Sequence, residues 1–217
     1  MASSIAPNII TDGLVLYLDA ANLKSYVSGS TTWTDMAAGN NGTLINGPTF
    51  NSTNGGSIVF DGTNDYVNCG NIMPTSAYTK CVFFNISNLA TNNNLISGAS
   101  NGTHYFYPAA GSYLRAGHFQ GAEIVSNTPI VANQWYHGAI TFSNTAGFVM
   151  YQNGAVVGSN ASTATFTGGN VVYVGAYEPA SNLLTGRIAI AQIYNRVLSA
   201  TEIQQNYNTT KTRFGLT

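Results

Sequence analysis

Short runs of apolar and aromatic residues recur along the chain, separated by clusters of Gly, Asn, Ser and Thr. Runs of about four to eight residues rich in Val, Ile, Tyr and Phe, bounded by such clusters, are typical of strands in an antiparallel all-β domain. The pattern therefore predicts strands at residues 14–19, 57–60, 81–86, 105–107, 113–119, 134–142, 148–152, 171–175 and 187–194.

The clearest turn signal is Asn153-Gly154, which lies inside the segment 150–157. Both residue types adopt positive φ readily, as a type I′ hairpin turn requires, so this segment is predicted to be a hairpin. No linker, composition shift or repeat divides the chain, and β-sandwiches of about 200 to 250 residues commonly form one domain. We expect one domain at residues 13–217, preceded by an N-terminal arm at residues 1–12. The arm carries apolar residues at positions 5, 7, 9 and 10, and we expect it to be ordered across an interface with another subunit or a scaffold.

A helix start is predicted near the C-terminus. Ser199 and Glu202 have the spacing of a capping box, and Leu198 can pack against Ile203 across the first turn. Tyr207 continues the apolar face one turn later. We expect a short helix that is seated on the edge of the sandwich.

Charge is unusually scarce, because Asp, Glu, Lys and Arg make up only 7% of the residues and the net charge is -1. Binding to nucleic acid needs clustered cations, so it is not expected. No apolar run approaches the roughly 18 residues of a membrane span, and no membrane insertion is expected. The first seven residues lack the pattern of a signal peptide.

Cys69 and Cys81 are too few for a disulfide framework, and we expect both to be buried thiols.

Four segments occur in a distinctive order: Gly-Leu-Val-Leu-Tyr-Leu-Asp at 13–19, Phe-Asp-Gly within 57–67, Trp-Tyr-His at 135–137 followed by Tyr-Gln-Asn-Gly at 151–154, and Gly-Arg-Ile at 186–188 leading into 193–199. Together they resemble the laminin-G-like family of concanavalin A-like jelly rolls. The resemblance implies an antiparallel jelly-roll β-sandwich with a short C-terminal helix. The family often has Asp-Glu where this chain has Ala189 and Ile190, so a charge that could serve a metal site is missing.

The resemblance leaves several functions open, because one fold carries many kinds of site. The version found here, including residues 211–216, is similar to predicted structural proteins of tailed bacteriophages. Our first hypothesis is a non-enzymatic structural or decoration module of a virus (bacteriophage) particle, with weak glycan binding or host-surface adhesion. The alternative is a dedicated carbohydrate-binding, lectin-like domain, and a glycoside hydrolase is a less favoured one. Expected partners are copies of the chain, other virion proteins and cell-surface glycans, at the virion surface or, alternatively, outside the cell.

Catalytic residues are not expected. A glycoside hydrolase usually needs two carboxylates about 5 to 9.5 Å apart, whereas the three glutamates are scattered and match no Glu-x-Asp-x-x-Glu pattern. They are Glu123, Glu178 and Glu202. Residues 98–102 match the nucleophile-elbow pattern around Ser100, but an elbow needs a helix to follow and residues 103–107 are predicted to be a strand. The histidines also lack the spacing of zinc ligands.

A calcium site is a candidate at one tight turn, where Asp61, Asn64 and Asp65 gather oxygen ligands of the kind that calcium prefers. The alternative is that Asp61 and Asn64 cap an ordinary Asp-Gly turn by bonding their own backbone. Asp19 and Asp35 could complete a site only if the fold brings them near. No cofactor other than calcium is expected.

The most aromatic hairpin of the chain is the candidate glycan site. Its residues combine rigid amphipathic rings with one cation that could anchor an acidic group. They are Tyr105, Tyr107, Tyr113, Arg115 and His118. The alternative is that these aromatic residues fill the core. Strand alternation also allows a mixed arrangement, in which Tyr105 and Tyr107 face opposite to His104 and Phe106.

Overall fold

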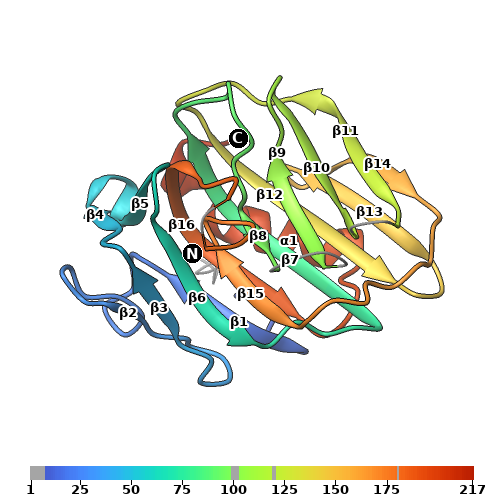
Figure 1. Cartoon of the computed structure of the whole chain (residues 1–217), viewed down its shortest axis with the longest axis horizontal. Coiled ribbons are helices and arrows are strands. Elements are labelled where there is room, and N and C mark those ends of the chain that lie inside the picture. Colours follow the sequence, from blue (N-terminus) through green and yellow to red (C-terminus); the bar gives the residue numbers. More distant parts are fainter. Residues whose placement is uncertain (1–7, 99–102, 119–120, 180) are drawn as a thin grey trace, which may run out of the picture.

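The predicted antiparallel jelly-roll sandwich is confirmed by a computed structural model, which describes residues 8–98, 103–118, 121–179 and 181–217. Figure 1 shows two layers of strands, one behind the other. The first layer is a sheet of eight strands in the order β14-β13-β12-β7-β16-β5-β4, with β1 also paired to β16. Their bounds are Ala155–Asn160, Gly147–Gln152, Trp135–Ser143, Ala77–Ile86, Thr185–Tyr194, Ser57–Asp61, Thr49–Asn51 and, for β1, Leu14–Asp19.

The second layer combines a five-stranded sheet, β2-β3-β6-β15-β8, with a three-stranded sheet, β9-β10-β11. Backbone bonds from the N–H groups of Leu95 and Gly98 to the carbonyls of Phe106 and His104 join β8 to β9, so the layer is continuous. The bounds of these strands, in that order, are Thr32–Trp33, Gly42–Ile45, Tyr66–Asn71, Val171–Val174, Ile96–Ser97, His104–Pro108, Tyr113–His118 and Glu123–Pro129.

The main core lies between the two layers. Phe84, Phe142 and Phe148 extend from the first layer, and Phe106 and Val172 meet them from the second. Every position of β7 after Ala77 is buried, because the first layer is covered on its outer face as well. Cys69 and Cys81 are both buried and free, as expected.

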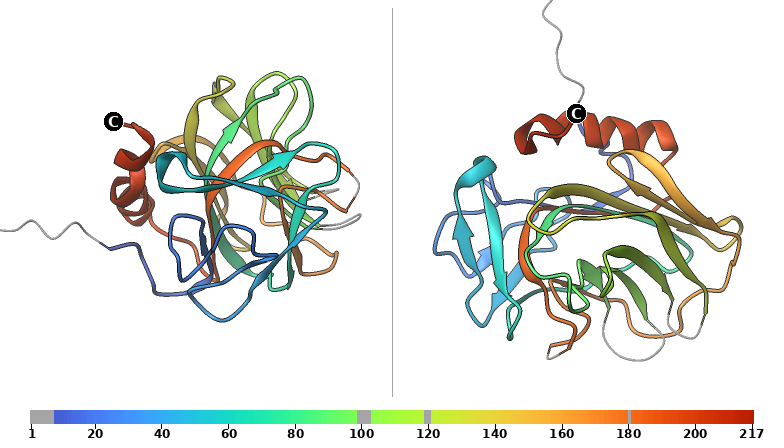
Figure 2. Two further views of the ribbon diagram at one scale, coloured as in Figure 1. Left: turned by 90° about the vertical axis from the view of Figure 1, so that its left-hand side faces the viewer. Right: turned by 90° about the horizontal axis from the view of Figure 1, so that it is seen from above.

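The helix α1, at Ala200–Thr210, begins as predicted: Ser199 and Glu202 form both bonds of the capping box. It lies over the outer face of the first layer and not on the edge of the sandwich, which corrects the expected position (Figure 2). The cause is a set of apolar side chains that point outward from the central strands. Leu198 and Ile203 cover Cys81, Ala139 and Tyr151, and Tyr207 and Phe214 cover Phe83, Trp135, Ala189 and Ile190.

Two short 3-10 helices complete the described structure, at Thr53–Gly55 and Lys211–Phe214. Within the described residues, no helix has the length and apolar character needed to cross a membrane. Ala189 and Ile190, where the resemblance led us to note missing acidic residues, are buried in a cluster that includes Phe214. The missing charges are therefore replaced by apolar packing beneath the C-terminal segment.

Residues 8–12 of the predicted arm belong to the body of the sandwich. Ile10 donates its backbone N–H to Asn206 (2.8 Å) and accepts a hydrogen bond from the Tyr194 hydroxyl (3.0 Å). Gln205 donates to the carbonyl of Asn8 (2.7 Å). Part of the predicted arm therefore packs against the same chain, and residues 1–7 lie outside the described part of the chain.

Candidate functional site

The outer face of β9 carries the central residues of the candidate site. His104 and Phe106 are buried, whereas Tyr105 and Tyr107 are half-buried and face outward. This is the mixed arrangement that strand alternation allowed. The rings of the two tyrosines lie 5.6 Å apart at an angle of 63°, so they form one continuous aromatic surface.

A cleft of about 300 Å³ opens beside these two rings. Its walls come from β9, from β11 and from the loops that precede β8 and β16. A volume of this size is at the lower end of the range for small-ligand sites, about 300 to 1,000 Å³. The described lining residues are Asn92, Asn94, Tyr105, Tyr107, Glu123, Tyr177 and Asn182.

Gly117 on β10 allows the tyrosines and Glu123 to come together. It pairs with Tyr105 on one side and with Glu123 on the other. A Cβ atom at this position would lie 2.1 Å from the carbonyl oxygen of Ala122 and 2.9 Å from the Tyr105 hydroxyl. Without a side chain at Gly117, the Tyr105 hydroxyl extends across β10 and donates to Glu123, a long contact of 3.4 Å.

Glu123 also forms an ion pair with Arg115, its diagonal neighbour on β10. Burial raises the pKa of Tyr105, and the negative charge of Glu123 raises it further. The same two causes raise the pKa of Tyr107. Both phenols therefore stay protonated at neutral pH and are available as hydrogen-bond donors.

The asparagines hold the loops of the cleft in place. The side-chain amide of Asn94 donates to the carbonyl of Asn182 (3.0 Å) and its oxygen accepts from the Ser97 hydroxyl (2.7 Å). Asn92 accepts from the backbone N–H of Ala110 (3.1 Å). These bonds connect the two loops to each other and to β8, so hydrogen bonds within the chain hold the wall of the cleft.

The structure brings together only part of the predicted glycan site. Tyr105 and Tyr107 line the cleft. Tyr113 is 42% exposed and pairs with Pro129 on the same outer face, outside the lining. Arg115 borders the cleft through its pair with Glu123. The two cleft loops lay outside the predicted strands, and nothing in their sequence signals that they meet.

His118 is a correction, because it faces the interior and not the candidate surface. Its side chain is 1% exposed. One ring nitrogen lies 2.9 Å from the Tyr78 hydroxyl and the other 2.7 Å from the carbonyl of Ala164. Burial lowers its pKa to about 4. The residue is a neutral core histidine that holds three segments together.

Beneath the cleft, the buried Lys80 of β7 donates to the carbonyl of Ile96 (2.9 Å) and lies 2.8 Å from a ring nitrogen of His104. Burial lowers the pKa of both Lys80 and His104 well below their usual values. The pair connects the first layer to β8 and β9, the strands that support the cleft. Sequence reasoning missed it, since the predicted strand began one residue after Lys80.

The other candidate chemistries are not assembled in the described part of the chain. It contains no group of three or more His, Cys, Asp or Glu side chains that could hold a metal ion. His137 is buried between the rings of Phe83 and Tyr207, as expected of a packed sheet residue. Residues 103–107 were predicted to be a strand, and His104–Pro108 form β9. Ser100 lies outside the described residues.

At the predicted calcium turn, the side-chain oxygens bond the backbone. Asp61 accepts from the N–H groups of Thr63 (2.7 Å) and Asn64 (3.4 Å), and Asp65 accepts from the N–H of Asp61 (3.1 Å). This geometry is that of the capped turn which the sequence left as the alternative. Calcium binding stays a prediction. The two further carboxylates are bonded elsewhere, Asp19 to Arg213 and Asp35 to the backbone of Tyr17, Ala37, Ala38 and Asn40.

Solved structures with a similar fold include proteins that act on or bind carbohydrates. The Trypanosoma rangeli sialidase in complex with sialic acid matches with a TM-score of 0.70 and 14% identity over 97% of this chain, which spans 36% of the sialidase chain. Domain 4 of a GH43 extracellular arabinanase from Geobacillus stearothermophilus, in complex with arabinotriose, matches with a TM-score of 0.64 and 18% identity, over 91% of this chain and 100% of that one. At such identities the likeness shows the fold alone.

At the level of sequence, no curated protein matches. A family model does match: Laminin G 3, described as the concanavalin A-like lectin/glucanases superfamily, aligns with residues 61–204. The matched region is more than half of the chain. It contains β7 to β16, and with them the whole cleft. The chain therefore belongs to the laminin-G-like family of the concanavalin A-like lectin/glucanase superfamily.

Proposed function

We propose that this domain is a non-catalytic glycan-binding module whose ligand site is the cleft beside Tyr105 and Tyr107. The observation that carries the proposal is the pairing of two half-buried aromatic rings with hydrogen-bonding groups in one preformed cleft. Aromatic faces offer rigid apolar area to the C–H surface of a sugar, while amides and a carboxylate can bond its hydroxyl groups. The arabinanase domain of the same fold, which was solved with arabinotriose, supports this assignment.

The chemistry of the cleft favours binding over hydrolysis. Among its described lining residues, Glu123 is the only carboxylate, and the usual glycosidase mechanism needs two. Glu202 is committed to the helix cap and to an ion pair with Arg196.

Display on a virus particle is the setting we propose for this binding activity. It is supported by the resemblance to bacteriophage structural proteins and by the scarcity of charge. The predicted arm gives less support than expected, since residues 8–12 contact the helix of the same chain. Electron microscopy of particles labelled with an antibody against the domain tests this setting. Labelling only of soluble fractions would contradict it.

The test of glycan binding is the Tyr107→Ala variant on an oligosaccharide array that includes arabinotriose. Loss of one stacking ring should weaken binding by about tenfold or more, as expected for an aromatic contact worth at least ~1.4 kcal/mol. Tyr113→Ala is the matched control, because Tyr113 lies on the same face outside the cleft. Unchanged binding by Tyr107→Ala, at an unchanged melting temperature, would overturn the proposed site.

A further inference from the structure

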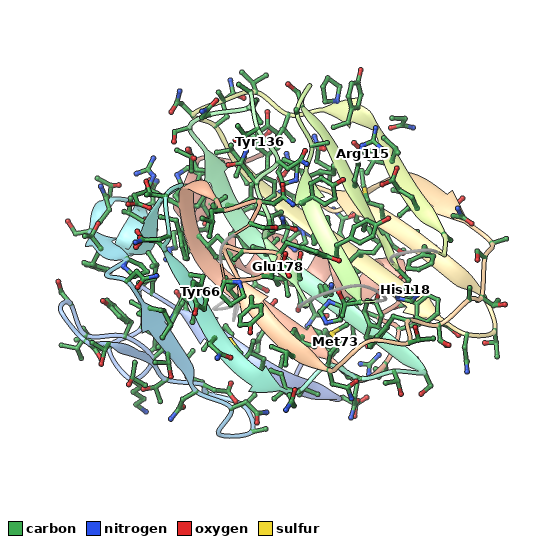
Figure 3. All side chains as sticks on the ribbon, viewed as in Figure 1. Tyr66, Met73, Arg115, His118, Tyr136 and Glu178 are labelled. Carbon is green, nitrogen blue, oxygen red and sulfur yellow. The ribbon has the colours of Figure 1, made fainter. Side chains whose placement is uncertain are left out.

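The charge that lines the cleft is negative. Glu123 is the only charged residue among the described residues that line it. Glu178 follows Tyr177 on one of the loops that form the wall. In Figure 3, Glu178 lies near the centre of the view and Arg115 lies over β10. An acidic ligand in this cleft would therefore lie close to a carboxylate and be repelled by it.

The nearby cation, Arg115, is not available to attract an acidic ligand. Arg115 is on the outer face of β10, where the sequence suggested that it could anchor an acidic group. In the structure its guanidinium forms an ion pair with Glu123, and the two side chains are 38% and 37% exposed. To bind the acid of a ligand, Arg115 would have to leave Glu123 and expose that carboxylate to a second negative charge.

The polar groups of the cleft suit hydroxyl partners. A carboxylate only accepts hydrogen bonds, and Glu123 has more acceptor sites than its bonds to Arg115 and Tyr105 occupy. The Tyr105 oxygen can itself accept while it donates to Glu123. Sugar hydroxyls donate and accept at once, so they can bond these groups without bringing charge into the cleft.

We infer that the cleft selects an uncharged saccharide unit and discriminates against uronic and sialic acids, an inference that rests on the proposed glycan-binding function. The selectivity comes from Glu123 in two ways. Its charge repels an acidic ligand directly, and its ion pair occupies the guanidinium of Arg115. The small volume of the cleft limits the recognised unit to a short portion of a glycan.

The experiment uses the full chain and pairs of oligosaccharides of equal length, one neutral and one acidic, on an array and by titration calorimetry. Suitable pairs are α-1,4-galactotriose with trigalacturonate, in which carboxylates replace the C6 hydroxymethyl groups, and the methyl ester of sialyllactose with sialyllactose itself. We expect the neutral member of a bound pair to bind at least about tenfold more tightly at low salt, with a smaller difference at high salt because screening weakens charge repulsion. Glu123→Gln should raise the affinity for the acidic member, since it removes the repulsion and frees Arg115.

Asp12→Asn is the matched control, because it removes the same charge from a residue that is bonded to Arg196 and lies outside the cleft. It should leave the selectivity unchanged. Tighter binding of the acidic members, or a selectivity that Glu123→Gln leaves intact, would overturn the inference while glycan binding stands. Binding to no glycan on the array would refute the proposed function, and this inference with it.

Discussion

Single residues of β10 decide which groups reach the cleft. Gly117 leaves the space through which Tyr105 meets Glu123. Positions 113, 115 and 117 share the outer face, because side chains alternate along a strand, and position 118 must then face inward. The sequence analysis grouped His118 with Tyr113 and Arg115 by its chemistry. Strict use of the alternation would have separated it from them.

The burial of His118 has a consequence for stability. Its pKa in the folded protein is about 4, below the value near 6.5 of an unfolded chain. The unfolded chain therefore binds a proton first as the pH falls, so stability is greatest above about pH 6.5 and declines toward pH 4. Between pH 7 and pH 5 this one group should cost about 2 kcal/mol of unfolding free energy.

Urea denaturation of wild type and His118→Gln at both pH values tests this linkage. We expect the loss between pH 7 and pH 5 to be smaller in the variant by about 2 kcal/mol. His104 and His137 also have lowered pKa values from burial, so both proteins should still lose stability. Equal losses in the two proteins would show that the fold does not lower the pKa of His118.

The C-terminal elements act as a cover for the first layer. Strands β7, β12 and β16 carry apolar side chains on both faces, and α1 and the 3-10 helix after it shield the outer set. The ring of Phe214 stacks on Phe83 at 4.9 Å and lies 4.5 Å from the ring of Trp135. Phe214 thus covers Phe83 and Trp135 on the outer face of the first layer.

Phe214→Ala should destabilise the domain by about 3 kcal/mol, the cost typical of truncating a buried Phe to Ala. Phe214 is 6% exposed, so its loss leaves a cavity and uncovers Phe83 and Trp135. The measurement is the change in unfolding free energy, with Thr212→Ala as an exposed control in the same short helix. A cost below about 0.5 kcal/mol, the range of surface changes, would mean that the C-terminal segment does not cover the sheet.

The whole molecule is one continuous two-layered body with little charge. Its two layers are joined at β8 and β9, and both ends of the described chain meet at α1, because Asn206 and Gln205 bond residues 8–10. A surface with few charges has little like-charge repulsion to oppose association with copies or a scaffold. Assembly stays a prediction, and residues 8–12 serve the fold of the single chain in any case.

Deletion of residues 1–12 separates a role in assembly from a role in the fold of the single chain. Loss of the Ile10 bonds to Asn206 and Tyr194 should lower the melting temperature of the single chain, because buried polar groups lose their partners. Sedimentation velocity of the full and shortened chains then tests the predicted assembly. A shortened chain that associates like the full one contradicts the role proposed for the arm. An unchanged melting temperature contradicts the role of residues 8–12 in the fold.

Local sequence patterns were sufficient for many of the strands and for the C-terminal helix, whereas the jelly-roll arrangement was expected from the resemblance to a known family. The Asn153-Gly154 turn, the Ser199 capping box and the alternation along β9 depend on neighbouring residues, so they could be identified without coordinates. Short strands with weak patterns, such as β2 and β8, were missed. They contain only two residues each, and their pairing depends on partners far away in the chain.

The site required the tertiary structure. The sequence alone determined that Tyr105 and Tyr107 share one face, because side chains two residues apart on a strand point to the same side. Only the fold brought Glu123, Asn94 and Asn182 to that face, since contacts between distant segments leave no periodic signal. The fold also paired Arg115 with Glu123 and so decided the charge of the cleft. Chemistry that depends on one strand could be predicted, and chemistry that depends on several loops meeting could not.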